Sequence, residues 1–384
     1  MNADALAVIA VLLAFIAISA CGETIVAGSA IGVKADDGMD DTKAMQAAID
    51  KVRGRSGVNI VFPRGRYDFF AGENPSSKHY ALLFDNINSL RITGIDAELV
   101  FHGLVAGFGF SRCSDVTVEG VVMDWQPPSF SVGEVAASDG MSFDVRMWDE
   151  FPVRGGEKVE AFMEYDAQTR RPLKRGLDVY YAVENTVLVE PQVLRVNLKR
   201  RIPVSPGSLV ILRHQVYGYN AMDFNECSNV TVAGATIYTA PGMGITGQYT
   251  KDIKVRNLEV RPRPGTNRIM STTADATHFN CCYGNIVMES CYFEGMGDDA
   301  VNVHGMYHVI DRLAGPDSIE TRCRNNWLLP PRPGDGMEFV HADTLIPFFE
   351  AAVKAVSVDN ASRKHRITFD RRLPDGIWAG DAVG

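Results

Sequence analysis

Apolar and polar residues alternate in five short segments spread along the chain. Two of them read "SDVTVEGVVMDW" from residue 114 and "SNVTVAGATIYT" from residue 228, and the others begin near residues 88, 251 and 284. Alternation with a period of two predicts β-strands, and one turn residue divides each segment into two short strands. These turn residues are Gly94, Gly120, Gly234, Asn257 and Ser290.

The spacing of the five segments indicates a solenoid. Asn229 lies 23 residues before Asp252, and Ser89 lies 26 residues before Asp115. Short strands that recur at such a period with no helix between them are typical of stacked coils, each of which buries its inner face on the next. We therefore expect an all-β protein built on a right-handed parallel β-helix.

A solenoid needs a cap, because its terminal coil exposes apolar surface. Residues 36–52, "DDGMDDTKAMQAAIDKV", predict a capping helix with Asp41 as its N-cap residue. The apolar residues of this segment share one helical face: Ala44, Met45, Ala48, Ile49 and Val52. The cap and the first coils are expected over residues 30–124.

Two stretches interrupt the repeat. Residues 125–218 and 306–384 each contain several strand-like runs separated by turns, and "PGSLVILRH" in the first has a counterpart, "PGDGMEFVH", in the second. We expect two inserted β modules that resemble barrels, with further coils over residues 219–305 between them. The chain stops without a closing coil, which suggests that it is truncated at its C-terminus.

The N-terminus predicts export. Residues 5–20 form an apolar run too short for a comfortable membrane span but suited to a signal peptide. The following "ISAC" resembles a bacterial lipobox, although the preceding "MNAD" lacks the usual basic residue. We expect residues 1–21 to be a signal and Cys21 a lipid anchor, which makes the protein an exported bacterial lipoprotein of the periplasm or cell surface. A plain secretory signal or an uncleaved anchor is the alternative.

The net charge of the chain limits the classes of partner that are expected. The formal net charge is −9 and the pI is near 5.4, whereas nucleic-acid binding needs clustered Lys and Arg. Nucleic acid is therefore not an expected partner.

The seven cysteines show no zinc-type spacing. Cys113 and Cys227 occupy the same place in two repeats, which favours buried thiols over disulfides.

Three aspartates carry the candidate chemistry. Asp298 and Asp299 are adjacent in "GMGDDAVNVHG", and Asp275 in "TTADATHFN" precedes Asp298 by 23 residues, or one coil. Equivalent positions on successive coils are neighbours, so all three carboxylates are expected on one outer face. Adjacent strand residues normally point to opposite sides, and we expect Gly297 to permit the bend that brings both Asp298 and Asp299 outward.

Such a carboxylate triad (Asp275, Asp298 and Asp299) suits glycoside hydrolysis. One carboxylic acid protonates the leaving oxygen while the others activate water, with a separation of about 6.5–9.5 Å in an inverting enzyme. Mutual repulsion raises one pKa and keeps a proton available near neutral pH. A calcium site also uses clustered carboxylates, but the loop has neither the EF-hand nor the nonapeptide calcium pattern. A purely structural cluster is the third interpretation.

These motifs resemble glycoside hydrolase family 110, the exo-acting α-galactosidases that remove terminal α-1,3-linked galactose. The resemblance rests on "DATHFN" followed 23 residues later by "GMGDDAVNVHG", and it extends through "YNAMDF" and "PGMGITG" over most of the chain after residue 30. It implies a bacterial parallel β-helix, a glycan substrate with terminal α-galactose, inversion, and no metal or cofactor. It also implies that Asp298 is the general acid and that Asp275 and Asp299 hold and deprotonate the water.

The polygalacturonase family also places an aspartate one coil before an Asp-Asp pair. Its Asn-Thr-Asp, Gly-His-Gly and Arg-Ile-Lys motifs are absent from this chain, and Asp275 lies in Thr-Ala-Asp instead. A hydrolase of a uronic polymer therefore remains an alternative, as does a non-catalytic β-helix that binds glycan.

Other residues are candidates for substrate binding. His278 and His304 lie near the carboxylates in sequence, and Arg268 lies in "RPRPGTNR", an extra loop in the coil that leads to Asp275. Structural histidines and a solvated surface loop are the alternatives. Galactose presents an apolar face that favours an aromatic platform, for which the candidates are Trp125, Trp327 and Tyr249.

Overall fold

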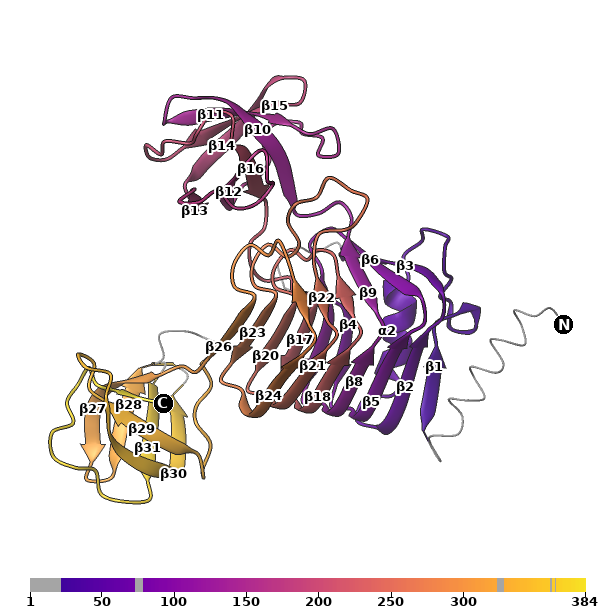
Figure 1. The fold of residues 1–384 in the computed structure, drawn as a ribbon. Coiled ribbons are helices and arrows are strands. Elements are labelled where there is room, and N and C mark those ends of the chain that lie inside the picture. The colour runs from indigo at the N-terminus through magenta and orange to yellow at the C-terminus, as the bar shows by residue number, and fades with distance from the viewer. Residues whose placement is uncertain (1–21, 73–78, 323–327, 360, 363) are drawn as a thin grey trace. The chain divides into compact units, whose positions relative to one another are not determined.

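Three sheets built from parallel strand pairs form the larger part of the protein (Figure 1). The computed structural model describes residues 22–72, 79–322, 328–359, 361–362 and 364–384. The predicted signal with Cys21 lies outside these residues, as do Cys323 and Trp327. The described part divides into two compact units at Val303 and His304, and each unit is considered by itself.

The chain visits the three sheets in turn, so each circuit adds one strand to each sheet. The first sheet holds β1 (Glu23–Val26), β2 (Ser56–Phe62), β5 (Asn88–Gly94), β8 (Ser114–Glu119), β18 (Ser228–Ala233), β21 (Lys251–Arg256) and β24 (Tyr283–Glu289). The second holds β3 (Gly65–Phe70), β6 (Ala97–His102), β9 (Val122–Trp125), β19 (Thr236–Ile237), β22 (Glu259–Val260) and β25 (Tyr292–Phe293). The third holds β4 (Tyr80–Asp85), β7 (Ala106–Ser111), β17 (Met222–Asn225), β20 (Ile245–Gln248), β23 (Thr277–Asn280) and β26 (Val301–His304). This arrangement is consistent with the predicted parallel β-helix, and we call it the stack.

The register of the stack matches the repeat in the sequence. Ser228 pairs with Ser114 on one side and with Lys251 on the other. All five predicted segments therefore lie side by side in the first sheet. Cys113 and Cys227 precede paired residues and are buried free thiols, as predicted.

The turn residues between the short strands explain how the chain changes sheet. Gly120, Gly234, Asn257 and Ser290 all have left-handed backbone conformations, with φ between 50° and 67°. Gly94 is not among the glycines with positive φ. It is needed for close approach of two coils, because a Cβ there would lie 2.9 Å from the carbonyl oxygen of Gly120 in the next coil. The repeated turn thus depends on residues that tolerate positive φ and on close backbone approach.

A single α-helix among the described residues covers the start of the stack. Helix α2 (Thr42–Asp50) follows the short 3₁₀ segment η1 (Ser29–Ile31) and buries Met45, Ala48 and Ile49. The helix begins after Asp41 as predicted, but the Asp41 side chain does not cap it: its carboxylate accepts from the Lys34 N–H at 3.1 Å. No helix in the described part of the chain is long and apolar enough to span a membrane.

An antiparallel sheet of seven strands interrupts the first unit between β9 and β17. It contains β10 (Phe130–Ser138), β11 (Ser142–Met147), β12 (Ala161–Tyr165), β13 (Asp178–Tyr180), β14 (Val183–Glu190), β15 (Val193–Leu198) and β16 (Leu209–Arg213). Its hydrophobic core also includes Ile269 and Met270, which belong to the loop between β22 and β23 of the stack. The two residues that follow the extra loop identified in the sequence therefore pack into the core of this antiparallel sheet.

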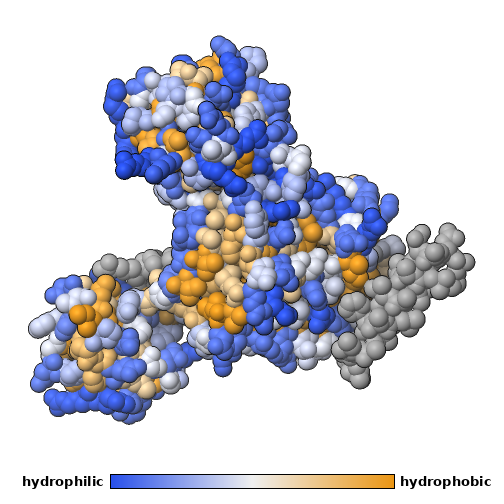
Figure 2. Space-filling model, viewed as in Figure 1, coloured by the Kyte–Doolittle hydropathy of each residue, from blue (hydrophilic) through white to orange (hydrophobic). Residues whose placement is uncertain are grey.

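The second unit is a small closed barrel. Its strands are β27 (His308–Gly315), β28 (Ser318–Arg322), β29 (Gly336–Val340), β30 (Pro347–Asp359), β31 (Lys364–Phe369) and β32 (Ala382–Val383). Neighbouring strands pair antiparallel around a core that includes Ile319, Phe339 and Ile367. The face of the protein that Figure 2 shows carries both polar and apolar residues.

Candidate active site

The carboxylate triad lies where the chain enters the last two strands of the third sheet. Asp275 precedes β23, while Asp298 and Asp299 lie in a bend between β25 and β26. The Ala276 N–H donates to the Asp299 carbonyl oxygen at 2.9 Å, and Thr277 Oγ1 donates to the carbonyl oxygen of Ala300 at 3.0 Å. Both contacts join residues 23 positions apart, so Asp275 lies one coil from Asp298.

Gly297 holds this bend against the preceding coil. Its N–H donates to the Thr272 carbonyl oxygen at 2.9 Å, and a Cβ at this position would lie 2.4 Å from the carbonyl oxygen of Thr273. Gly297 is therefore required for close approach of two backbones rather than for positive φ, which occurs at Gly295 instead (φ 71°). The bend leaves both Asp298 and Asp299 exposed to solvent.

The three carboxylates have different surroundings. Asp275 is buried, and its Oδ2 lies 2.6 Å from His278 Nδ1. Asp299 Oδ2 accepts a hydrogen bond from Asn302 Nδ2 at 3.1 Å. Asp298 Oδ2 accepts from the Tyr217 hydroxyl at 3.4 Å. Each carboxylate is thus held by a different polar side chain, which permits different roles.

The environment of Asp298 favours its protonated form. Although Asp298 keeps contact with solvent, burial is the largest of the effects that raise the pKa of its carboxyl above the usual range. The negative charges of Asp275 and Asp299 raise this pKa further, and Asp178 of β13 acts in the same direction. The hydrogen bond from Tyr217 opposes the rise, because it stabilises the carboxylate. Asp298 therefore keeps its proton at a higher pH than an isolated aspartic acid.

Two residues behind the triad were not found from the sequence. The side chain of Arg213 is completely buried, and its Nη1 donates to the carbonyl oxygens of Thr273 and Gly297, each at 3.2 Å. Asp178 forms an ion pair with Arg213 Nη2. Both residues come from the antiparallel sheet, which the sequence separates from the triad by about 60 residues or more. No local motif marks this contact.

The three residues predicted to bind substrate make different contacts in the structure. His278 of β23 contacts Asp275 directly. His304 is the first residue of the second unit, and its Nδ1 lies 3.0 Å from the Gly305 carbonyl oxygen. Arg268 Nη1 lies 2.6 Å from Oδ1 of Asp124, which is fully buried. Arg268 therefore has a structural role as the counterion of Asp124, and its role in substrate binding remains a prediction.

The structure also changes which aromatic residues can serve as a platform for the sugar. Trp125 is 1% exposed and stacks on Phe101 at a ring-centroid distance of 4.3 Å, so its prediction as a sugar platform was wrong. Trp125 lies two residues after Met123 in β9, so both side chains point to the same side of the strand, which faces the core. Tyr217, which was not predicted, is an aromatic residue that contacts the triad.

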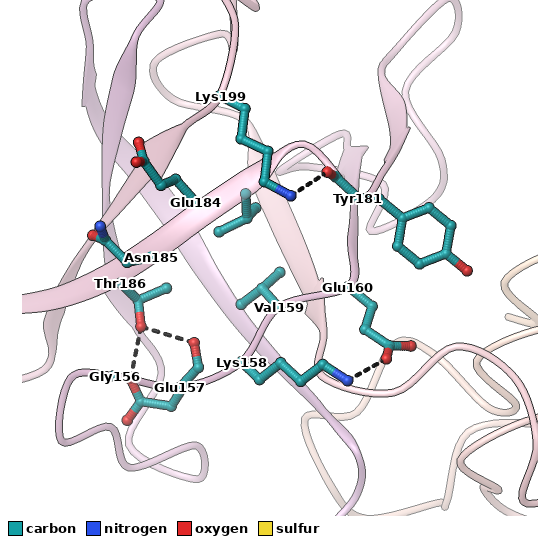
Figure 3. Close-up of a pocket in the computed structure, with 11 residues that line it drawn as sticks. Gly156, Glu157, Lys158, Val159, Glu160, Tyr181, Glu184, Asn185, Thr186 and Lys199 are labelled. Carbon is teal, nitrogen blue, oxygen red and sulfur yellow. Dashed lines mark hydrogen bonds and ion pairs between the residues drawn. The ribbon is translucent and has the colours of Figure 1, made fainter.

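A pocket of about 410 Å³ lies in the antiparallel sheet, and no residue of the triad lines it (Figure 3). Lys199 Nζ donates to the Tyr181 carbonyl oxygen at 3.0 Å, Lys158 pairs with Glu160 at 2.5 Å, and Thr186 Oγ1 donates to the Glu157 carbonyl oxygen at 2.9 Å. Both lysines of this pocket and Thr186 are therefore engaged with neighbouring residues, and we place the candidate site at the triad. Within the described residues, no group of three or more His, Cys, Asp or Glu is arranged to hold a metal ion.

Comparison with known proteins points to carbohydrate chemistry. Residues 331–383 match the family described as GLAA-B beta-barrel domain II. The chain is 26% identical over 404 residues to "Alpha-1,3-galactosidase B" of Bacteroides thetaiotaomicron, covering 95% of this chain and 65% of the relative. It is also 26% identical over 391 residues to "Alpha-1,3-galactosidase A" of Shewanella woodyi, covering 92% of this chain and 63% of the relative. The chain thus spans slightly less than two thirds of the length of these relatives.

Among solved structures, the chain is similar to a Yersinia enterocolitica family 28 exopolygalacturonase. The TM-score is 0.41 at 15% identity, and the match covers 76% of this chain and 46% of the other.

Proposed function

We propose that this protein is a glycoside hydrolase that removes terminal α-1,3-linked galactose from a glycan with inversion at the anomeric carbon. The observation that carries the proposal is the stacking of Asp275 one coil from Asp298, with Asp299 adjacent and the pKa of Asp298 raised. The names of the relatives support the choice of galactose and of the α-1,3 linkage.

In this proposal Asp298 is the general acid. Its raised pKa retains the proton that the leaving oxygen needs as the glycosidic bond breaks. Asp275 and Asp299 act as the base: one orients a water on the opposite side of the anomeric carbon, and together they accept its proton. The hydrogen bonds from His278 to Asp275 and from Asn302 to Asp299 fix these two carboxylates.

The anomeric configuration of the released galactose tests this proposal. Proton NMR of galactosyl-α-1,3-galactose during digestion should show β-galactose first, with α-galactose appearing only through mutarotation. If α-galactose appears first, the enzyme retains configuration and the water-activating roles of Asp275 and Asp299 are wrong. If a folded protein releases no galactose from this disaccharide, hydrolysis of a uronic polymer and non-catalytic glycan binding become the better explanations.

Titration of Asp298 provides a second test. Replacing Asp299 by Asn removes one negative charge beside Asp298, so the pKa of Asp298 should fall and the carboxyl should lose its proton at lower pH. The measurement is ¹³C NMR of the labelled carboxyl as a function of pH. Replacing Asp96, in the turn between β5 and β6, by Asn is the matched control and should leave the titration unchanged. An unchanged titration in Asp299→Asn would show that the two carboxyls do not interact.

We also propose that the protein is exported and anchored to a bacterial membrane through a lipid on Cys21. The support is the apolar run over residues 5–20 followed by "ISAC". Cells that express the full chain and are fed a labelled fatty acid should label the protein, and the Cys21→Ser variant should not be labelled. Labelling of both proteins would reject the anchor at Cys21.

A further inference from the structure

Tyr217 occupies the segment that returns from the antiparallel sheet to the stack. Its hydroxyl donates to Asp298 Oδ2 at 3.4 Å, and its side chain is partly exposed. Burial, the interaction with the Tyr180 hydroxyl and the charges of Asp298 and Asp275 raise the pKa of this phenol, so it remains protonated over the whole range in which an aspartic acid titrates. Tyr217 is therefore a permanent hydrogen-bond donor at the edge of the triad.

The ring of Tyr217 is supported by a second aromatic ring. Tyr180 of β13 lies parallel to it, with ring centroids 6.4 Å apart and an angle of 10° between the ring planes. The Arg213 guanidinium carbon lies 4.7 Å from the centre of the Tyr180 ring, and Arg213 Nη1 donates to the Tyr180 hydroxyl oxygen at 3.3 Å. Such cation–π and ring contacts restrict the orientation of Tyr180 and hence of Tyr217.

The same guanidinium also holds the backbone of the triad. The two carbonyl groups that accept from Arg213 Nη1 belong to Thr273, two residues before Asp275, and to Gly297, directly before Asp298. Arg213 is fully buried, and Asp178 balances its charge. One buried cation thus fixes both the main chain that carries Asp298 and the aromatic pair that contacts the Asp298 side chain.

We propose that Tyr217 is a positioning residue for Asp298, and that the antiparallel sheet supports this residue through Tyr180 and Arg213. The hydroxyl of Tyr217 holds one oxygen of the Asp298 carboxyl, which leaves the other oxygen to carry the proton toward the leaving group. The acid role of Asp298 rests on the function proposed above, whereas the contact between Tyr217 and Asp298 does not.

The Tyr217→Phe variant tests the proposal, because it keeps the ring and removes only the hydroxyl. Loss of a donor to the carboxylate raises the pKa of Asp298, so the alkaline limb of the pH dependence of kcat/KM should move upward by about 0.5–1 pH unit. Looser positioning of the acid should also lower kcat by about tenfold with a smaller change in KM. The ¹³C titration of the Asp298 carboxyl should show the same upward shift without substrate.

Tyr80→Phe is the matched control. The Tyr80 hydroxyl donates to Asp223 Oδ2 at 2.9 Å, which is also a bond from tyrosine to carboxylate on the stack but outside the triad. This variant should lose thermal stability without moving either the alkaline limb or the titration of Asp298. The positioning role is supported if the alkaline limb and the Asp298 titration shift in Tyr217→Phe but not in Tyr80→Phe. It is overturned if Tyr217→Phe lowers the melting temperature and shifts neither of them.

Hydrolysis of an α-galactoside tests the proposed function, and the titration of the Asp298 carboxyl tests this inference. If the unmodified protein hydrolyses no α-galactoside, the proposed function fails, and the titration alone then decides whether Tyr217 controls Asp298. If the unmodified protein is active but the Asp298 titration is the same with Tyr and Phe at position 217, the inference fails while the proposed function stands.

Discussion

Asp298→Asn is expected to lower kcat/KM for galactosyl-α-1,3-galactose by about 10²–10⁴-fold, the range that general acid catalysis contributes. The amide has nearly the size of the carboxyl but cannot release a proton to the leaving oxygen. The measurement is the initial rate of galactose release at the pH optimum of the unmodified protein. A loss smaller than about tenfold would exclude Asp298 as the acid.

The dependence on the leaving group separates a lost acid from a damaged site. An aryl α-galactoside with an acidic phenol leaves without protonation, so its hydrolysis by Asp298→Asn should be reduced far less than that of the disaccharide. An Asp275→Asn variant should lose activity on both substrates alike, because water activation is needed for each. Equal losses on both substrates in Asp298→Asn would contradict the acid role.

The same substitution should not destabilise the fold. The pKa of Asp298 is raised in the folded protein, so between its unfolded and folded pKa values the folded state binds more protons and stability falls as the pH rises. Above both pKa values the carboxyl is ionised in the folded and the unfolded states, and this charge is unfavourable in the folded protein. The neutral Asn removes this cost, and the melting temperature at pH 7 should equal or exceed that of the unmodified protein.

Arg213→Met is expected to lower the free energy of unfolding by about 1–3 kcal/mol, the usual cost of leaving a buried hydrogen-bonding group without its partner. The substitution leaves Asp178 without its counterion, and it leaves the carbonyl oxygens of Thr273 and Gly297 without a donor in a buried site. Urea unfolding monitored by circular dichroism measures the loss. A change below about 1 kcal/mol would show that solvent reaches this position.

Arg195→Met is the matched control for that prediction. Arg195 belongs to the same antiparallel sheet and pairs with Asp144 through two hydrogen bonds of 2.7 and 2.8 Å, but its side chain is 46% exposed. Solvent screening and side-chain entropy reduce the value of such a pair to about 0.2–1 kcal/mol. Comparable losses in Arg195→Met and Arg213→Met would mean that burial does not distinguish the two arginines.

The sequence predicts the triad because the stack is periodic. A strand that repeats every 23 residues places Asp275 beside Asp298 without any knowledge of the rest of the chain, and the hydrogen bond from Thr277 to Ala300 spans the same interval. Period-two alternation likewise predicts the strands of the first sheet, since one face of each is buried. These are regularities of local sequence, and short-range patterns are sufficient to find them.

The remaining contacts of the site have no such regularity. Tyr217 reaches Asp298 across 81 positions, and Arg213 reaches Gly297 across 84, through a sheet whose packing depends on distant residues. Arg268 lies in the loop where a substrate-binding arginine was expected, yet buried Asp124 engages it. A sequence shows which side chains carry charge, but the partner of each is decided by tertiary packing.

The pairing of β8 with β18 has a consequence for the modularity of the protein. Ser114 and Ser228 are direct neighbours in the first sheet although 114 residues separate them. Closing so long a connection costs chain entropy that grows only with the logarithm of its length, so the stack tolerates a whole sheet inserted at one of its corners. A chain shortened by excision of this sheet would keep the coil register and retain all three carboxylates. It would have lost the Arg213 guanidinium and the Tyr180 ring that support the main chain beside Asp298 and the ring of Tyr217, and would be a scaffold that carries the proposed catalytic residues without the contacts that this sheet supplies.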